Sequence, residues 1–321
     1  MRVEAFEVIQ PGFLTTVQDK GRHGYQQYGV PVSGAMDSYS LMVANLLLGN
    51  EEGDACLEIT VLGPHLRVLA DTAVAVSGAD LSPALNNGPL PMWEAVKVRS
   101  GDTISFGHPR NGCRSYLAVA GGIDVPQVMA SRSTYLQSRL GGFEGRPLRS
   151  GDRLRRGQAR VEIPSRTLPR QYIPEYQAEN ELRAILGPQD DHFTETGIRT
   201  FLGSEYTISL QADRMGYRLE GPHVEHKAGA DIVSDGIPPG AVQVPGDGLP
   251  IILLADRQTT GGYVKIATVS TVDLPKLAQA RPGDRVRFLQ VTEEEAYRLL
   301  REYEKSIDAL KQWIQHNDKG L

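Results

Sequence analysis

The chain of 321 residues is long enough for two domains, because a domain typically holds about 100–200 residues. Hydrophobic residues make up 40% and charged residues 23%, and the 34 glycines and 20 prolines stay below the share of about 25–30% that marks low-complexity disorder. The composition therefore indicates a globular protein. A net charge of -5 without a long basic run argues against a nucleic-acid partner.

The sequence gives no sign of membrane insertion, secretion or structural metal binding. The longest apolar run, residues 250–255, is far shorter than the roughly 20 residues of a membrane span, and residues 1–4 begin no signal peptide. We therefore expect a cytoplasmic protein with no membrane partner. Cys56 and Cys113 show no metal-ligand spacing, so we expect neither a disulfide framework nor a metal bound by this chain.

Short β-branched segments between clusters of Gly, Pro, Asn and Asp predict a mainly β protein. The predicted strands, in chain order, are 3–9, 73–76, 93–98, 103–106, 116–120, 206–210, 241–244, 251–254, 263–269 and 285–289. Asn87-Gly88 predicts a tight type I′ hairpin, because both central residues of that turn need a positive φ.

Two helices are predicted within this β pattern. The first begins at Asp37, a suitable N-cap, and ends at Gly49. The second begins with a capping box formed by Thr292 and Glu295 and carries apolar residues at three- and four-residue spacing as far as Ile314. Its charged opposite face predicts an amphipathic C-terminal helix that packs against a core.

A proline-containing segment, residues 153–177, lacks clear periodicity and predicts a linker between two domains. A Gly-Asp turn followed by an alternating strand occurs at residues 100–106 and again at 282–288, which favours two related halves. A third copy of the turn at residues 150–154 leaves open whether the pattern reflects duplication or only a common turn.

Two polar segments in the first half are candidate binding loops. In the first, Asp19, Arg22 and Ser33 lie among glycines that permit close backbone approach to a polar ligand. Alternatively, Asp19 and Arg22 form an ion pair that stabilises the loop, and Ser33 caps the first helix. The second segment, residues 131–134, follows a predicted strand, and Arg132 either holds a carboxylate or phosphate or forms an ordinary salt bridge.

The densest polar segment lies between Gln243 and Lys265. The apolar strand 251–254 leads into five polar residues, 256–260, which are costly to bury without partners. Gly261 and Gly262 follow and suit a backbone that passes close to a small ligand. We expect a binding loop here, the alternative being a hydrogen-bonded β-turn. The chain has no phosphate-loop motif at a strand-to-helix junction, which argues against a self-sufficient classical ATPase.

Long phrases of the sequence resemble the biotin-dependent carboxyltransferase-like family, also called allophanate hydrolase subunit 2. The C subunit of bacterial 5-oxoprolinase is similar, and such proteins are also described as antagonists of the Kip-type histidine-kinase inhibitor. The matching phrases are residues 12–22, 33–37, 57–60, 131–134, 213–219 and 254–263. The resemblance implies two tandem cyclophilin-like β-barrel domains with a few helices and the amphipathic C-terminal helix. We expect these parts at residues 1–165, 166–291 and 292–321.

The resemblance also implies a function. It points to the C subunit of an ATP-dependent 5-oxoprolinase, a hydrolase that cleaves 5-oxo-L-proline to L-glutamate and is active only with an A subunit and a Kip inhibitor-like B subunit. The alternatives are a non-catalytic antagonist that binds a Kip-type inhibitor and the carboxyltransferase half of a biotin-dependent urea or amide carboxylase. ATP with magnesium is then expected at the level of the complex, with no metal or biotin bound by this chain alone.

Residue chemistry assigns expected roles within this resemblance. The cations of Arg257 and Lys265 are suited to stabilise transferring charge, and the carboxylate of Asp256 to orient or deprotonate water. The residues expected to bind the substrate are Gln18, Asp19, Arg22, Ser33, Arg132, Ser133, Arg214, Gln243, Gln258, Thr259, Thr260, Gly261 and Gly262. On this basis Asp256→Asn is expected to keep the melting temperature and to lower turnover at least about 100-fold.

Overall fold

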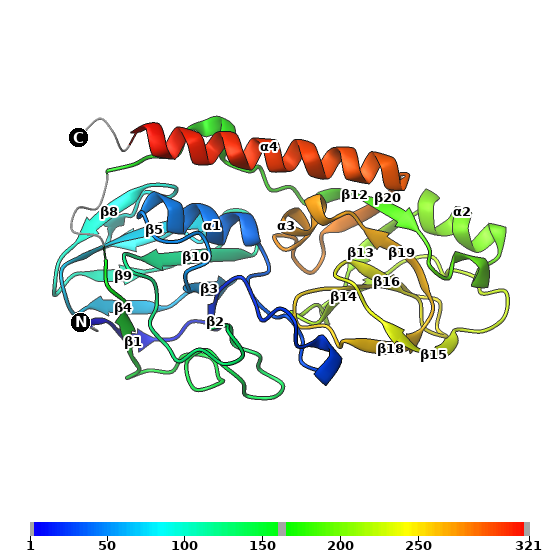
Figure 1. The fold of residues 1–321 in the computed structure, drawn as a ribbon, viewed down its shortest axis with the longest axis horizontal. Coiled ribbons are helices and arrows are strands. Elements are labelled where there is room, and N and C mark those ends of the chain that lie inside the picture. The colour runs from blue at the N-terminus through cyan, green and yellow to red at the C-terminus, as the bar shows by residue number, and fades with distance from the viewer. Residues whose placement is uncertain (1–2, 160–164, 318–321) are drawn as a thin grey trace. The chain divides into compact units, whose positions relative to one another are not determined.

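The computed structural model describes residues 3–159 and 165–317 (Figure 1). The chain forms two compact units: unit 1 comprises Met1–Arg22, Ser33–Tyr176 and Asp308–Leu321, and unit 2 comprises His23–Val32 and Gln177–Ile307. The expected domain borders at 165/166 and 291/292 stay a prediction. Residues 160–164 of the predicted linker lie outside the described residues. The linker begins later than predicted, because Arg153–Arg156 forms a strand of unit 1.

Unit 1 contains two antiparallel sheets with the strand orders β11-β1-β4-β9-β6-β7 and β2-β3-β10-β5-β8. The strands of the first sheet are β1 (Val3–Gln10), β4 (His65–Val68), β6 (Ala84–Leu85), β7 (Gly88–Pro89), β9 (Thr103–Ser105) and β11 (Arg153–Arg156). Those of the second are β2 (Leu14–Gln18), β3 (Cys56–Thr60), β5 (Thr72–Gly78), β8 (Ala95–Val98) and β10 (Arg114–Val119). One core cluster draws on both sheets, with Phe6 and Leu66 from the first and Ile59 and Leu117 from the second. The two sheets therefore pack face to face.

Helix α1 (Ser38–Leu47) covers the outer face of the second sheet (Figure 1). Val74 and Val76 of β5 belong to the core between the sheets, while the alternating residues Ala73 and Ala75 pack in the cluster that contains α1. These small side chains let the helix approach the sheet closely. The predicted N-cap is confirmed, because Asp37 Oδ1 accepts a hydrogen bond from Ser40 N at 3.0 Å.

Unit 2 contains a closed barrel with the strand order β12-β19-β16-β17-β14-β13-β20 and a separate two-stranded antiparallel sheet of β15 and β18. The barrel strands are β12 (Glu179–Leu186), β13 (Glu205–Ile208), β14 (Gly216–Glu220), β16 (Ala241–Gln243), β17 (Ile251–Leu253), β19 (Lys265–Val269) and β20 (Arg285–Gln290). The strands of the two-stranded sheet are β15 (Asp231–Gly236) and β18 (Thr260–Tyr263), and the short helices of this unit are α2 (Glu195–Gly203) and α3 (Leu274–Leu277). The barrel closes through parallel pairing of β12 with β20. A mainly β fold is thus confirmed, while the cyclophilin-like assignment stays an expectation.

Helix α4 (Glu293–Asn317) confirms the predicted amphipathic C-terminal helix. Its capping box is formed as expected: Thr292 N donates to Glu295 Oε2 at 2.9 Å and Glu295 N donates to Thr292 Oγ1 at 3.2 Å. Leu310 and Ile314 are buried in the cluster that also contains α1. Among the described helices, none combines the length and apolar character that crossing a bilayer requires.

The predicted type I′ hairpin is shifted by one residue. Leu85 pairs with Gly88, so the central turn residues are Asn86 and Asn87, with φ angles of 51° and 67°. Asparagine tolerates the left-handed region better than most residues, which permits this turn without glycine at its centre. Gly88 instead begins β7.

Glu52 ties α4 to the loop after β2 within unit 1. Its Oε1 atom accepts a hydrogen bond from Lys20 Nζ at 2.5 Å, and its Oε2 atom accepts one from Lys311 Nζ at 2.5 Å. The hydrogen bonds from Lys20 and Lys311 lower the pKa of the Glu52 carboxyl below its ordinary value of 4.5. This ion-pair network is therefore a pH-dependent contribution to the stability of the fold.

We expect Glu52→Gln to lower the free energy of unfolding at pH 7 by at most about 1 kcal/mol, because partly exposed ion pairs are screened by solvent. Since the pKa of Glu52 is lower in the folded chain, its contribution is complete above 4.5 and disappears as the pH falls through the folded value. Urea denaturation should show the difference from the unmodified protein at pH 7 but not at about pH 3. Glu51→Gln is the control and should show none; an equal deficit of Glu52→Gln at both pH values would contradict the role of Glu52.

Candidate functional site

The carboxylate of Asp19, directly after β2, is buried and accepts four hydrogen bonds. Its Oδ1 atom accepts from Gly21 N at 2.8 Å, from Ser131 Oγ at 2.7 Å and from Ser133 Oγ at 2.5 Å. Its Oδ2 atom accepts from Arg132 N at 2.5 Å. Hydrogen bonds to an ionised acceptor are about twice as strong as neutral ones. Asp19 therefore fixes the segment 131–134 to the end of β2.

Two further predicted residues hold the same segment. Arg22 donates from Nη2 to Ser133 O at 2.6 Å and from Nε to Val128 O at 3.3 Å. Gln18 donates from Nε2 to Thr134 O at 3.1 Å. The structure thus brings together five of the predicted substrate-binding residues of this half, namely Gln18, Asp19, Arg22, Arg132 and Ser133, and gives most of them a positioning role.

Ser33 lies beside this group, because Ala35 N donates to Asp19 O at 2.9 Å. Ser33 has a φ of 54° and is 5% exposed. Within the described parts of the chain, its Oγ atom and the buried Oε1 atom of Gln18 have no hydrogen-bond partner. An unpaired buried polar atom is costly, so these two oxygens are available to a polar ligand.

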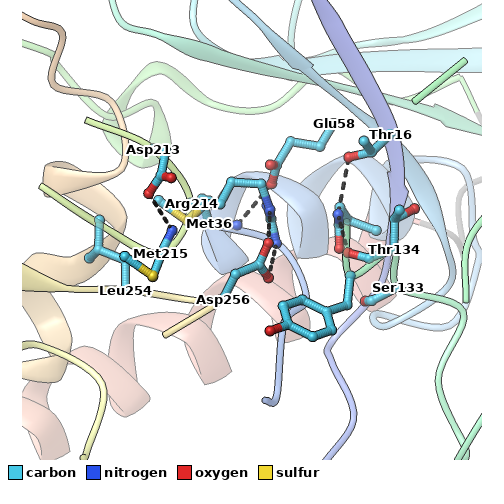
Figure 2. Close-up of polar contacts among 12 residues, drawn as sticks. Thr16, Met36, Glu58, Ser133, Thr134, Asp213, Arg214, Met215, Leu254 and Asp256 are labelled. Atoms are coloured by element: carbon cyan, nitrogen blue, oxygen red, sulfur yellow. Dashed lines mark hydrogen bonds and ion pairs between the residues drawn. The ribbon is translucent and has the colours of Figure 1, made fainter. Parts of the chain in front are cut away.

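A second buried polar group of unit 1, centred on Glu58, was not predicted from the sequence. Glu58, in the middle of β3, accepts a hydrogen bond at Oε2 from Met36 N at 2.8 Å (Figure 2). The same oxygen accepts a second one from Tyr116 Oη at 2.7 Å. Tyr116 Oη in turn accepts from Asp37 N at 2.8 Å, and burial raises the pKa of Tyr116 well above its ordinary value. The sequence does contain a signal for this group: the carboxylate of Glu58 stands between apolar residues of the strand 56–60, and a buried charge requires partners.

In unit 2, Arg214 and Asp256 form a buried bidentate ion pair (Figure 2). Arg214 Nε donates to Asp256 Oδ2 at 2.9 Å and Nη2 donates to Oδ1 at 3.1 Å, and the two side chains are only 5% and 7% exposed. Arg214 precedes β14 and Asp256 follows β17; because β14 pairs with β17, the two side chains meet at one end of these strands. Asp256 keeps lone pairs that can still accept from a ligand.

The buried side chain of Arg257 connects two loops through hydrogen bonds. Its Nε atom donates to Ile237 O at 2.9 Å and its Nη1 atom donates to Leu254 O at 3.0 Å. Because burial disfavours the charged form, the pKa of Arg257 falls to about 10. Both of these contacts are to carbonyl oxygens, which fix the guanidinium in place.

The side chains of Lys265 and Gln243 are buried, and Lys265 contacts a carboxylate that faces the solvent. They are direct cross-strand partners on β19 and β16, so both side chains lie on the same face. Lys265 Nζ donates to Asp235 Oδ2 at 2.7 Å, and this contact lowers the pKa of the largely exposed Asp235. Gln189 Oε1 accepts from Lys265 N at 3.1 Å. Asp235 and Gln189 were not predicted, because each lies in a sequence typical of turns.

The predicted segment 258–262 lies against this group. A Cβ atom on Gly261 would come within 3.0 Å of Gln243 Nε2 and 3.4 Å of Gln258 Nε2. Thr260, Gly261 and Gly262 belong to β18, and Thr259 O accepts a hydrogen bond from Ile237 N at 3.0 Å. The glycine at 261 therefore makes room for the protein's own carboxamides, and one of them, Gln243, is the cross-strand partner of Lys265.

The unit 2 group offers donors and acceptors rather than metal ligands. An ammonium carries three N–H donors, and Lys265 uses one of them on Asp235. The carboxamides of Gln243 and Gln258 can both donate and accept. Across the described residues, no three His, Cys, Asp or Glu side chains gather as metal ligands would. The arrangement suits a ligand with an amide and an anionic oxygen.

The chain matches known proteins along most of its length. A family model described as a carboxyltransferase domain, subdomain A and B, matches residues 28–290. The chain is 38% identical to the C subunit of 5-oxoprolinase from Escherichia coli, covering 97% of this chain and 99% of that protein, and 35% identical to the protein of the same name from Haemophilus influenzae, covering 96% and 98%. It is also 35% identical to the urea amidolyase of Lachancea kluyveri, of which it covers 18%.

The solved structures agree with these relatives. The structure of the K. lactis urea amidolyase superposes with a TM-score of 0.90 at 35% identity, covering 97% of this chain and 20% of that one. The structure of the Kluyveromyces lactis urea carboxylase gives the same score and covers 29% of that chain. The fold described above is therefore shared with part of these larger proteins.

The buried ion pair changes the expected behaviour of Asp256→Asn. We now expect a loss of about 3–5 kcal/mol in the free energy of unfolding, because the buried Arg214 guanidinium would lose the carboxylate with which it forms a bidentate ion pair. The expectation of an unchanged melting temperature, drawn from the sequence, is thereby revised. Glu7→Gln, which breaks the exposed pair with Arg67, is the control and should cost less than about 1 kcal/mol. Equal losses in urea denaturation would contradict a structural role for the Arg214–Asp256 pair.

Proposed function

The chain belongs to the family of carboxyltransferase domains with subdomains A and B, and we propose that it is the C subunit of an ATP-dependent 5-oxoprolinase. In this proposal it cleaves 5-oxo-L-proline to L-glutamate with hydrolysis of ATP and is active only in a cytoplasmic hetero-oligomer with the A and B subunits. ATP and magnesium act at the level of that complex.

The relatives favour this function over other family activities. The chain matches the two proteins named as the C subunit of 5-oxoprolinase along nearly their whole length, whereas it corresponds to only 18% of the urea amidolyase from Lachancea kluyveri. These proteins of similar size are therefore the nearer functional parallel. The urea amidolyase likeness supports carboxyltransfer to an amide as the second candidate function.

The side chains around Lys265 carry the chemical part of the proposal. 5-Oxoproline presents a lactam amide and a carboxylate. Lys265 and Gln243 are cross-strand partners in the barrel, and the amide nitrogens of Gln243 and Gln258 both lie close to Gly261. A carboxamide can pair with the lactam amide, and an ammonium stabilises negative charge that develops on oxygen. This juxtaposition of an ammonium with carboxamides supports a polarised amide substrate.

A lactam resists hydrolysis, so the proposed reaction first makes its carbonyl carbon more electrophilic. The lactam oxygen attacks the terminal phosphorus of ATP and ADP departs. Water then adds to the activated carbon, and the ring C–N bond breaks with protonation of the nitrogen, which leaves an acyl phosphate at that carbon. A second water attacks the same carbon, and the bond from carbon to the phosphate oxygen breaks to release inorganic phosphate. We assign stabilisation of the transferring charge to Lys265 and orientation of water to Asp256, while Arg257 positions the loop through its bonds to Ile237 O and Leu254 O.

Lys265→Met tests this assignment in the reconstituted complex. We expect turnover to fall at least about 100-fold, because the variant removes an electrostatic group. The variant should still fold, because methionine is similar in length to lysine. The Asp235 carboxylate loses the contact with Lys265 but is 53% exposed to water. Release of glutamate and ADP is measured together with the melting temperature. Lys276→Met, at a partly exposed lysine of the same unit, is the control and should keep full turnover.

Two outcomes would contradict the proposal. Normal turnover of Lys265→Met would remove Lys265 from the reaction. Failure of the complete, folded mixture of all three subunits to convert 5-oxoproline would overturn the enzymatic function itself. If the chain then still bound a Kip-type inhibitor, the non-catalytic antagonist would be the better description.

Association with the Kip inhibitor-like B subunit is a separate expectation. A stable heteromer needs a buried interface of at least about 1,200 Å². Co-expression should therefore give one complex, with two copies of each protein expected, that survives size-exclusion chromatography at micromolar concentration. Elution as two separate monomers would contradict a shared functional unit.

A further inference from the structure

A cavity of about 640 Å³ lies in unit 1, outside both groups described above. Its walls are the loop 139–145, the edge strand β11 with Glu4 of β1, and residues 124–128. The volume falls within the range of about 300–1,000 Å³ that is typical of small-molecule sites. The proposed function does not use this cavity.

The loop 139–145 lines the cavity and contains backbone donors that are not used within the described part of the protein. Among the described residues, the N–H groups of 141, 142, 143 and 144 have no hydrogen-bond partner. Arg139, Gly141, Gly142, Glu144 and Gly145 all have φ angles between 51° and 66°. Successive amides in left-handed or turn conformations form a concave nest that binds anions. Four consecutive unused donors therefore make this wall suited to negative charge.

Two arginines add positive charge to the same cavity. Arg139 belongs to the loop, and Arg155 lies on the same face of β11 as Arg153, two residues away. Arg153 is paired with Glu4, and the carboxylate of Glu144 is paired with Arg146. In the portion of the chain that the structure describes, neither Arg139 nor Arg155 has a side-chain ion pair or hydrogen bond. Their charges remain available to a ligand.

The loop is held in this conformation by the Asp19 group. A Cβ atom on Gly141 would come within 2.3 Å of Ser133 O, and one on Gly142 within 1.8 Å of Thr134 Oγ1. Glycine is thus required at both positions for the loop to lie on the segment 131–134. That segment is fixed by Asp19 and Arg22, so the amide nest is built on a rigid support.

We infer that this cavity is a binding site for a phosphate-bearing ligand, with the amides of residues 141–144 and the guanidinium groups of Arg139 and Arg155 around its phosphate oxygens. Arginine forks and backbone amides are the two donor types that recognise phosphate most often. Inorganic phosphate compounds and nucleotides share this chemistry, and the probes below distinguish them. The inference goes beyond the lactam-cleaving activity and stands independently of it.

The test measures binding to the full chain alone, without turnover. Pyrophosphate, orthophosphate and ATP are titrated by calorimetry at constant ionic strength. The variant Arg139→Gln/Arg155→Gln is compared with the unmodified protein and with Arg99→Gln/Arg149→Gln, which removes two exposed arginines of unit 1 outside the cavity. We expect pyrophosphate to bind the unmodified and control proteins alike and the cavity variant at least about tenfold more weakly. Melting curves verify that all variants fold.

The amide signals of Gly141 and Gly142 should also shift in NMR spectra when pyrophosphate is added. If ATP binds at least as tightly as pyrophosphate and is weakened by the same variant, the ligand is a nucleotide; if it binds more weakly, the ligand is a smaller phosphate compound. Absence of binding by all three probes at millimolar concentration would overturn the inference. Equal binding to the cavity variant and the control would overturn it as well.

Discussion

The buried carboxylate of Asp19 is the constraint on which the functional architecture of unit 1 depends. It joins β2 to residues 131–133, more than one hundred positions away, through donors from Gly21, Ser131, Arg132 and Ser133. A carboxylate is costly to bury, and the four hydrogen bonds offset that cost. They also place the segment on which the glycine loop 139–145 rests. One buried carboxylate thus orders two loops of this unit, residues 131–134 and 139–145.

Unit 2 also contains a buried carboxylate, but there the carboxylate is paired with an arginine instead of with backbone and hydroxyl donors. The ion pair of Arg214 and Asp256 closes one end of β14 and β17, and Arg257 braces the loop that follows. The charged groups in these contacts hold the backbone in place. Lys265, by contrast, pairs with the solvent-facing Asp235 and retains N–H donors beside Gln243. Within this unit, the proposed stabilisation of transferring charge therefore rests on Lys265 rather than on Arg257, and Asp256 keeps the proposed role of orienting water.

Local signals in the sequence predicted part of the elements and missed others, among them strands β2, β3, β12 and β14. The alternation in β5 and the caps at Asp37 and Thr292 act over a few residues, so their consequences can be read directly. The barrel closure between β12 and β20 joins residues about one hundred positions apart and leaves no local trace. For the same reason the partners of Asp256 and Lys265 could not be derived from spacing. Some strands and both long helices were therefore predictable from local patterns. Which charged side chains hold the structure and which are available to a ligand could be seen only in the fold.

The proposed activation of the lactam is tested most directly by the path of its carbonyl oxygen. The complete mixture of this chain with the A and B subunits is given ATP and 5-oxo-L-proline labelled with oxygen-18 at the lactam carbonyl. If that oxygen attacks phosphorus, it remains bonded to phosphorus when the bond to carbon breaks, so the label should appear in inorganic phosphate. Transfer should require this chain. Formation of glutamate with all the label retained and none in phosphate would contradict the account.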